Sequence, residues 1–307
     1  MLIPWVTVWG FGADISVRGE SLFVRGKGMR EAERYALSDV SHLLIAGDNL
    51  LHTSVISQCS KREIPVSFFD IHGKPEGSLF RSEKPRLSSA QDAVPKHAFA
   101  LAAAEAAADA RMRFLHELSA SRPDLFYQGE FELLTHARSE FEYLITLPEL
   151  TRGYSLTKNM YYEILSRVVP RKLGYARRVE GASPDAVNVL FSRGYAVLYA
   201  TTAAACVGAG LDLNKGSLHE KPGACIYDIM EPALVPMVDR AVIKTAASGL
   251  LDTCTMSSSR CIIPEDAAAF FAKELSSSVD RTVIEENVFA YANAVEEGGV
   301  VSYHYPA

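Results

Sequence analysis

Short apolar runs separated by glycines fill the first 80 residues of the chain. Trp5–Trp9 alternates apolar and polar positions, as half-buried strands do, and Asp14–Val17 and Ser21–Val24 follow as further strand candidates. Val40–Ala46 and Ile64–Phe69 are apolar runs of the length of a buried strand. The pattern therefore predicts a strand-rich region.

One helix and one hairpin complete this region. Leu50–Cys59 repeats its apolar residues with helical spacing, which predicts a short helix. Asp70–Gly77 contains a glycine and a proline and predicts a hairpin turn into Ser78–Phe80. We therefore predict a β-rich N-terminal domain over residues 1–85.

The character of the sequence changes after this domain. Residues 82–95 are mostly polar and contain two prolines, so we interpret 86–95 as an interdomain linker. From Lys96 an alanine-rich segment without proline or glycine favours a helix. The fold class predicted is α+β multidomain, with an all-α C-terminal catalytic domain at 96–307 and a loosely held tail from Val301. Further helices are expected at Gly129–Thr146, Leu156–Arg167, Asp185–Val207, Pro232–Ala247, Glu265–Glu274 and Arg281–Val295.

Composition places the chain among folded intracellular proteins. It has 307 residues, of which 48% are hydrophobic and 22% charged. The five cysteines form no CxxC pair, which argues against a zinc framework, and their odd number argues against a secreted disulfide scaffold. The first residues indicate a strand rather than a signal peptide, and no segment makes a convincing membrane span. We expect a cytoplasmic protein without a membrane partner.

Charge is unevenly distributed along the chain. The net charge of −6 argues weakly against a nucleic-acid partner, but one short stretch is strongly basic. Such a strip suits a phosphodiester substrate, or it is simply a solvated cationic loop. Its members are Arg167, Arg171, Lys172, Arg177, Arg178 and Arg193.

Candidate chemistry lies between Leu211 and Asp239. A glycine-punctuated loop carries His219, and a strand-like apolar run, Ala224–Tyr227, leads to Asp228 and Glu231. These two carboxylates are three residues apart, so on a helical turn they share a face. One imidazole and two carboxylates suit a site for Mg²⁺ or, because of the nitrogen, Mn²⁺. Spacing alone leaves open that they are a loop histidine and a solvated helix start.

The order of these features resembles a known family, the CRISPR-associated integrase of the adaptation stage. In the N-terminal part, the segment HLLIAGDNLLHTSVISQCSKREIPVSFFDIHGKPEGSLF is similar to that family's strand, helix, strand and hairpin. In the C-terminal part, a D-x-v-N helix, a Gly-Tyr, a Gly-x-x-His loop and a D-x-x-E/D helix follow in the family's order. The matching positions are Asp185, Asn188, Gly194, Tyr195, Gly216, His219, Asp228 and Glu231.

The resemblance implies an activity and a set of partners. It implies a homodimer formed through the β-rich domain, and metal ligands at His219 and Glu231 with Asp228 beside them. The implied activity is that of a metal-dependent DNA endonuclease and integrase with His219, Asp228 and Glu231 as catalytic residues. A 3′-hydroxyl of spacer DNA attacks a phosphodiester, and the reverse reaction cuts branched DNA. The implied partners are double-stranded and branched DNA and a small ferredoxin-like CRISPR adaptation protein. Arg171, Lys172, Arg177, Arg178 and Arg193 are then DNA-binding candidates, and Asn188 is a candidate to support the metal ligands.

One departure from the family pattern concerns its third metal ligand, a glutamate. In this chain the matching position falls at Tyr154 or Ser155, and neither is a carboxylate. Loss of a negative ligand lowers affinity for a hard dication. The alternative hypothesis is therefore a DNA-binding, dimeric family member with impaired catalysis. A third, an unrelated metal-dependent hydrolase, is distinguished by whether the protein binds DNA.

Overall fold

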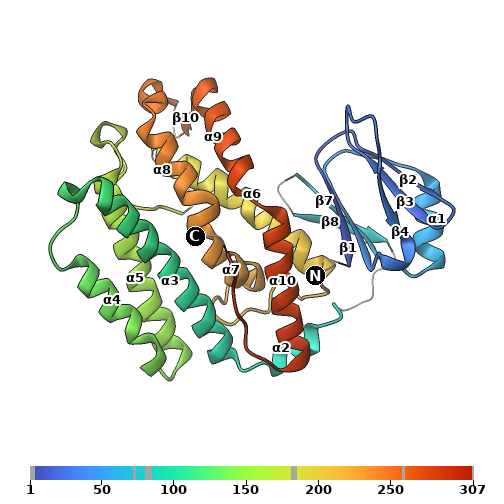
Figure 1. The fold of residues 1–307 in the computed structure, drawn as a ribbon, viewed down its shortest axis with the longest axis horizontal. Coiled ribbons are helices and arrows are strands. Elements are labelled where there is room, and N and C mark those ends of the chain that lie inside the picture. Colours follow the sequence, from blue (N-terminus) through green and yellow to red (C-terminus); the bar gives the residue numbers. More distant parts are fainter. Residues whose placement is uncertain (1–3, 72–73, 80–84, 181–184, 258–259, 306–307) are drawn as a thin grey trace.

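Two small sheets and one helix form the N-terminal part of the protein, and helices form most of the rest (Figure 1). The computed structural model describes residues 4–71, 74–79, 85–180, 185–257 and 260–305. The predicted division into a β-rich and a helical part is confirmed. Residues 82–84 of the predicted polar segment lie outside the described residues.

The first sheet has the strand order β1-β5-β7-β8, in which β8 runs antiparallel to β7 and the other pairs are parallel. The second sheet has the order β4-β3-β2-β6. Apolar residues of both sheets and of α1 share one core, with Ile15, Leu43 and Val55 fully buried. The elements are β1 (Trp5–Trp9), β2 (Asp14–Arg18), β3 (Ser21–Arg25), β4 (Glu33–Ala36), η1 (Leu37–Asp39), β5 (His42–Ala46), β6 (Leu50–Leu51), α1 (Thr53–Lys61), β7 (Val66–Phe69) and β8 (Pro75–Leu79).

The helical part is built around α3, α5, α6 and the segment that follows Gly223 (Figure 1). Buried apolar side chains from all of these elements form the largest core of the protein. The elements are α2 (Ser88–Ala93), α3 (Lys96–Ser121), η2 (Pro123–Leu125), α4 (Glu130–Ser139), η3 (Phe141–Tyr143), α5 (Leu147–Val168), η4 (Arg171–Leu173), α6 (Ala186–Gly208), α7 (Ala224–Met230), η5 (Glu231–Ala233), the π-helical turn η6 (Val235–Asp239), α8 (Arg240–Ala247), η7 (Leu250–Thr253), β9 (Thr255–Ser257), β10 (Arg260–Ile262), α9 (Glu265–Ser278) and α10 (Arg281–Glu297).

Strand β1 joins the two parts. The Trp5 indole packs beside Phe289 of α10, with ring centroids 6.2 Å apart, and its N–H donates to Glu285 over 3.2 Å. Gly208 at the end of α6 permits this approach, because a Cβ there would lie 2.8 Å from the indole. The β-rich part is thus held against α6 and α10.

Several local predictions are wrong. The segment 86–95 is not a free linker, because it contains α2, whose Gln91 side chain is buried and hydrogen-bonds to the loop after α6. The run Ala224–Tyr227 is helical, not a strand, since it opens α7. The C-terminal part also contains the small hairpin of β9 and β10, so it is not all α. Within the described ranges, no helix has both the length and the apolar character to span a membrane.

The segment predicted to be a loose tail is packed as far as residue 305. Val301 is buried, and the Tyr305 hydroxyl donates to the Ile229 carbonyl of α7 over 2.9 Å. The Asn287 side chain in α10 exchanges two hydrogen bonds with the backbone of His304. Residues 301–305 therefore help to hold α7 in place.

Candidate active site

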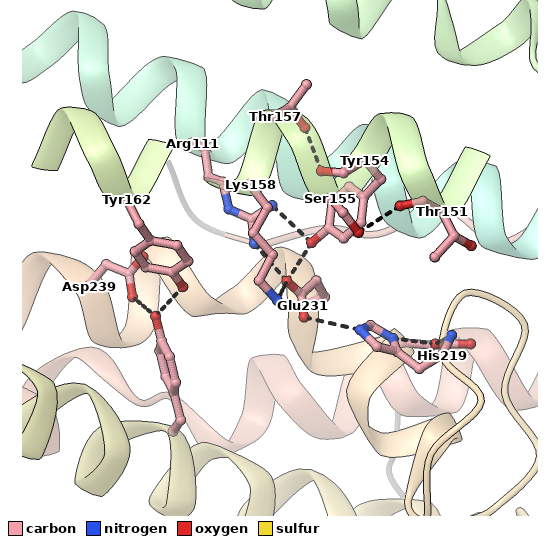
Figure 2. Close-up of polar contacts among 12 residues, drawn as sticks. Arg111, Thr151, Tyr154, Ser155, Thr157, Lys158, Tyr162, His219, Glu231 and Asp239 are labelled. Carbon is pink, nitrogen blue, oxygen red and sulfur yellow. Dashed lines mark hydrogen bonds and ion pairs between the residues drawn. The ribbon is translucent and has the colours of Figure 1, made fainter. Parts of the chain in front are cut away.

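Glu231 lies at the centre of the site, in the turn η5 directly after α7. Its side chain is 3% exposed. The Glu231 Oε1 atom accepts a hydrogen bond from Arg111 over 2.7 Å and another from the Tyr154 hydroxyl, and it forms an ion pair with Lys158 Nζ at 2.9 Å. Figure 2 shows these three side chains converging on the one carboxylate from α3 and α5.

Asp228 organises the loop that carries His219. Its carboxylate accepts the backbone N–H groups of Ser217, Leu218 and His219. The imidazole Nδ1 of His219 lies 2.8 Å from Asp228 Oδ1, so Nδ1–H donates to the carboxylate. The other ring nitrogen, Nε2, then faces Glu231 Oε2 at 3.6 Å. Gly216 allows the loop to approach α7 this closely, because a Cβ there would lie 2.7 Å from the Ala224 side chain.

The two residues considered for the third ligand position are placed differently toward Glu231. Tyr154 is buried and its hydroxyl contacts Glu231. Ser155 is exposed, and its hydroxyl donates to the Thr151 carbonyl over 2.7 Å, away from Glu231 (Figure 2). Of the two, Tyr154 is therefore the residue that contacts Glu231.

Charge around Glu231 favours its ionised form. Burial alone would raise the pKa of Glu231, but Lys158 and Arg111 together lower it below its ordinary value. Burial raises the pKa of Tyr154 well above its ordinary value, so the phenol stays protonated and can donate to Glu231. Two cations thus surround one carboxylate at the base of the site.

A second buried carboxylate lies beside this cluster. Asp239, at the end of η6, accepts hydrogen bonds from the hydroxyls of Tyr161 over 2.8 Å and Tyr195 over 2.6 Å. The Tyr162 hydroxyl lies 2.7 Å from that of Tyr195. Burial raises the pKa of Asp239 to about 6, against the lowering effect of the two tyrosine hydrogen bonds.

Two cavities open at this cluster. One, of about 580 Å³, is lined by Tyr154, Ser155 and His219, and the other, of about 410 Å³, by Tyr195 and Glu231. Both cavities are also lined by Lys158, Glu180 and Lys221. The site is thus open to solvent from two sides of Lys158.

Comparison with known proteins assigns the family. A sequence model of the family described as CRISPR associated protein Cas1 matches residues 6–277. The chain belongs to the Cas1 family. It is 27% identical to a Cas1 protein of Methanospirillum hungatei, over 91% of this chain and 93% of that protein. It is 23% identical to the CRISPR-associated endonuclease Cas1 of Mycobacterium tuberculosis, over 81% of this chain and 74% of that protein.

Solved structures confirm the Cas1 fold. The Cas1 chain of a partial Cas6-RT-Cas1–Cas2 complex superposes with a TM-score of 0.80 at 17% identity, covering 99% of both chains. A casposase bound to its integration product superposes with a TM-score of 0.75 at 21% identity, covering 95% of both chains. At these identities the likeness shows the fold alone.

The residues present are a poor fit for the divalent metal that the Cas1 resemblance implies. His219 Nε2 and Glu231 Oε2 face one another and are the two groups left to hold an ion. Beside them, the protonated phenol of Tyr154 donates to Glu231 instead of offering a negative oxygen. Arg111 and Lys158 already bring two positive charges to the one carboxylate, and they would repel a dication. In the described ranges, no three His, Cys, Asp or Glu side chains are grouped to hold a metal ion.

The predicted DNA-binding residues lie mainly on the surface. Arg171, Arg177 and Arg193 are exposed, whereas Lys172 forms an ion pair with Asp252. Arg178 is partly buried, and its guanidinium stacks 5.4 Å from the centroid of the Tyr195 ring, at the smaller cavity. Arg178 is therefore the member of the basic strip that reaches the site.

Asn188 supports this strip rather than the candidate metal ligands. Its side-chain oxygen accepts from the Val179 N–H over 2.8 Å and from Arg178 over 3.1 Å. Its amide donates to the Arg177 carbonyl and to Asp185. In the described part of the chain these hydrogen bonds place Asn188 behind Arg178, so its expected support of a metal ligand is not what the structure shows.

Sequence reasoning missed two of the side chains that define the site. Lys158 lies four residues after Tyr154, so helical spacing places the two on one face, which could have indicated it. Arg111 lies 120 residues before Glu231 in the chain, within an alanine-rich helix. Its signal is weak, namely an arginine among the apolar residues Ala108 and Leu115 on the buried face of α3.

Proposed function

We propose that this protein acts in CRISPR adaptation as a DNA-binding Cas1-family protein whose own phosphodiester chemistry is impaired. The observation that carries the second half of this proposal is the contact between Tyr154 and Glu231, where a third carboxylate ligand is expected. The first half is supported by family membership and by the relatives named as CRISPR-associated endonucleases. In this role the protein holds spacer DNA and the target without joining them itself.

The proposed partners follow from the same relationships. We infer branched and double-stranded DNA as the ligand, because one structural neighbour is a casposase bound to an integration product. Another neighbour belongs to a complex with Cas2, which supports a small CRISPR adaptation partner for this chain. A homodimer through the β-rich part agrees with three exposed apolar side chains at one end of the second sheet, Phe11, Met29 and Leu50.

A second candidate function is a metal-dependent integrase that works slowly. One observation favours it: Asp228 orients His219 so that Nε2 faces Glu231. Two ligands would then hold the ion, and a 3′-hydroxyl would attack the phosphodiester. This candidate needs the two cations on Glu231 to be displaced, so the first function is the better supported.

Two assays with purified protein separate the two candidates. One uses a labelled branched DNA, and the other uses a spacer-length duplex with a plasmid target. Both are run in Mg²⁺ and in Mn²⁺. We expect retention of the branched DNA in a gel-shift assay, with affinity that falls steeply as salt rises. We also expect neither cleavage nor integration above the background of His219→Ala. Turnover that His219→Ala and Glu231→Ala abolish would establish the integrase, and absence of DNA binding would refute both.

A further inference from the structure

The two cations on Glu231 have different surroundings. Arg111 is 3% exposed, and its guanidinium donates one hydrogen bond to Glu231 and another to the Tyr154 hydroxyl. Lys158 is 24% exposed and lines both cavities. Arg111 is therefore a buried structural partner of Glu231, whereas Lys158 is a cation that a ligand in either cavity can reach.

The ammonium group of Lys158 can donate further hydrogen bonds at this position. Lys158 Nζ carries three N–H donors, and within the described ranges the structure gives it one partner, Glu231. Arg111 and Lys158 both contact Glu231, so Lys158 is not the only cation on this carboxylate. Its remaining N–H donors and its positive charge suit the single negative charge of a phosphodiester group.

The walls of the two cavities also carry a positively charged and a negatively charged side chain at the rim. Lys221 is exposed, lines both cavities and lies 3.6 Å from the centroid of the Tyr227 ring, which holds its ammonium near the rim. Glu180 is exposed at the same rim and repels an anion there. The anion is therefore favoured at depth, beside Lys158, rather than at the edge.

We propose that Lys158 binds a DNA phosphodiester in this site and takes the electrostatic place of a divalent cation, so that DNA enters without metal. Lysine is a compact point charge that binds phosphate oxygens well. The inference rests on the proposed DNA-binding function and adds the group that contacts the phosphate. It assigns the two cavities, which Lys158 lines, to nucleic acid because the proposed function is DNA binding.

The test compares DNA binding by the full chain with and without metal. Fluorescence anisotropy of a labelled branched DNA is measured in EDTA and in MnCl₂ at matched ionic strength. We expect dissociation constants that agree within about twofold between the two buffers. We expect Lys158→Ala to weaken binding by about tenfold or more, the loss of one charged contact, and to lower the salt dependence by about one counterion.

Control variants separate a phosphate contact from a structural effect. Lys244→Ala removes a lysine that also forms an ion pair with a glutamate, Glu274, but at the surface on α8. We expect it to bind DNA like the parent, and Lys158→Arg to keep most of the affinity. Circular dichroism and the unfolding midpoint of Lys158→Ala report its fold, which Arg111 continues to support at Glu231.

Several outcomes would overturn the inference. DNA binding that falls more than about tenfold in EDTA would show that metal is needed and leave the proposed function standing. Equal losses in Lys158→Ala and Lys244→Ala would remove Lys158 from the interface. A thermal shift with inorganic phosphate that depends on Lys158, without any Lys158 effect on DNA, would assign the site to a free anion. No DNA binding by the parent in either buffer would refute the proposed function and the inference together.

Discussion

At the scale of single residues, the hydroxyl of Tyr154 determines what Glu231 can bind. A glutamate at this position would add a negative oxygen, whereas the phenol donates a hydrogen bond to Glu231 and adds no negative charge beside Arg111 and Lys158. The site is therefore stable without an ion. Two substitutions test the charge balance at this scale.

Tyr154→Glu is expected to create Mn²⁺ affinity that the parent lacks. The new carboxylate would face Glu231 and His219 and would offset the charge of Arg111, its present hydrogen-bond partner over 2.9 Å. Since a charged contact is worth on the order of 1.5–3 kcal/mol, affinity should rise by tenfold or more. Isothermal titration with MnCl₂ measures the change. Ser155→Glu is the comparison variant, because the Ser155 hydroxyl bonds to the Thr151 carbonyl and not to Glu231, and an equal gain there would contradict our assignment of the third position to Tyr154.

Asp239→Asn is expected to flatten the pH dependence of stability. Burial raises the pKa of Asp239 from 3.8 to about 6, so the native state binds this proton more readily than the unfolded chain. Its contribution to stability is fully present below about pH 4 and is lost as the pH rises through 6. The loss is on the order of 3 kcal/mol by about pH 7.

Urea unfolding of parent and variant across this pH range measures that difference. Asp266→Asn is the control, because Asp266 is exposed. Parallel curves for parent and Asp239→Asn would contradict the predicted contribution.

At the scale of elements, the loop before α7 positions the site because the loop is hydrogen-bonded to α7. Asp228 accepts three backbone N–H groups from that loop and orients His219. The loop, rather than the helix alone, therefore sets the position of the imidazole.

Asp228→Ala should loosen this loop. The N–H groups of Ser217, Leu218 and His219 would lose their acceptor, and the first two residues are buried. We expect faster amide exchange at these positions and a free energy of unfolding lower by on the order of 2 kcal/mol or more. Glu220→Ala, an exposed neighbour, should leave both quantities unchanged. Unchanged exchange in Asp228→Ala would show that other contacts hold the loop.

The pattern of the sequence predicted the elements better than the site. The strands at Trp5–Trp9 and in β7, and the long helices α3, α6 and α10, follow from periodicity and alanine content. The start of α7 was mistaken for a strand because Ala-Cys-Ile-Tyr is continuously apolar, and burial on all sides hides a helical period. Arg111 could not be paired with Glu231 from local spacing, since the contact is made by tertiary packing of α3 on η5.

At the scale of the whole molecule, the β-rich part presents an apolar end to solvent. Phe11, Met29 and Leu50 are each about 60% exposed and lie at the end of the second sheet where Asp14 pairs with Arg25 and Leu50. Three exposed apolar side chains at one end of a sheet suit a site of association. It supports the proposed homodimer.

The double substitution Phe11→Ser and Met29→Ser should therefore dissociate the dimer. We expect the parent to have the mass of two chains at micromolar concentration and the variant to have that of one, by light scattering after size exclusion. Ile145→Ser is the control, because Ile145 is a strongly exposed apolar residue of the helical part. A monomeric parent would refute the dimer, and a dimeric double variant would move its interface elsewhere.

The hydrogen bond from Tyr305 to Ile229 has a consequence for the order in which the protein is made. Helix α7 is synthesised long before residue 305, yet its backbone at Ile229 receives this partner only when Tyr305 emerges from the ribosome. The two hydrogen bonds between the Asn287 side chain and the His304 backbone likewise form only after His304 has been synthesised. A nascent chain stopped between these points already contains His219, Asp228 and Glu231 but lacks the contact that seats their helix. Such truncated products would carry His219, Asp228 and Glu231 without the hydrogen bond that Tyr305 donates to α7.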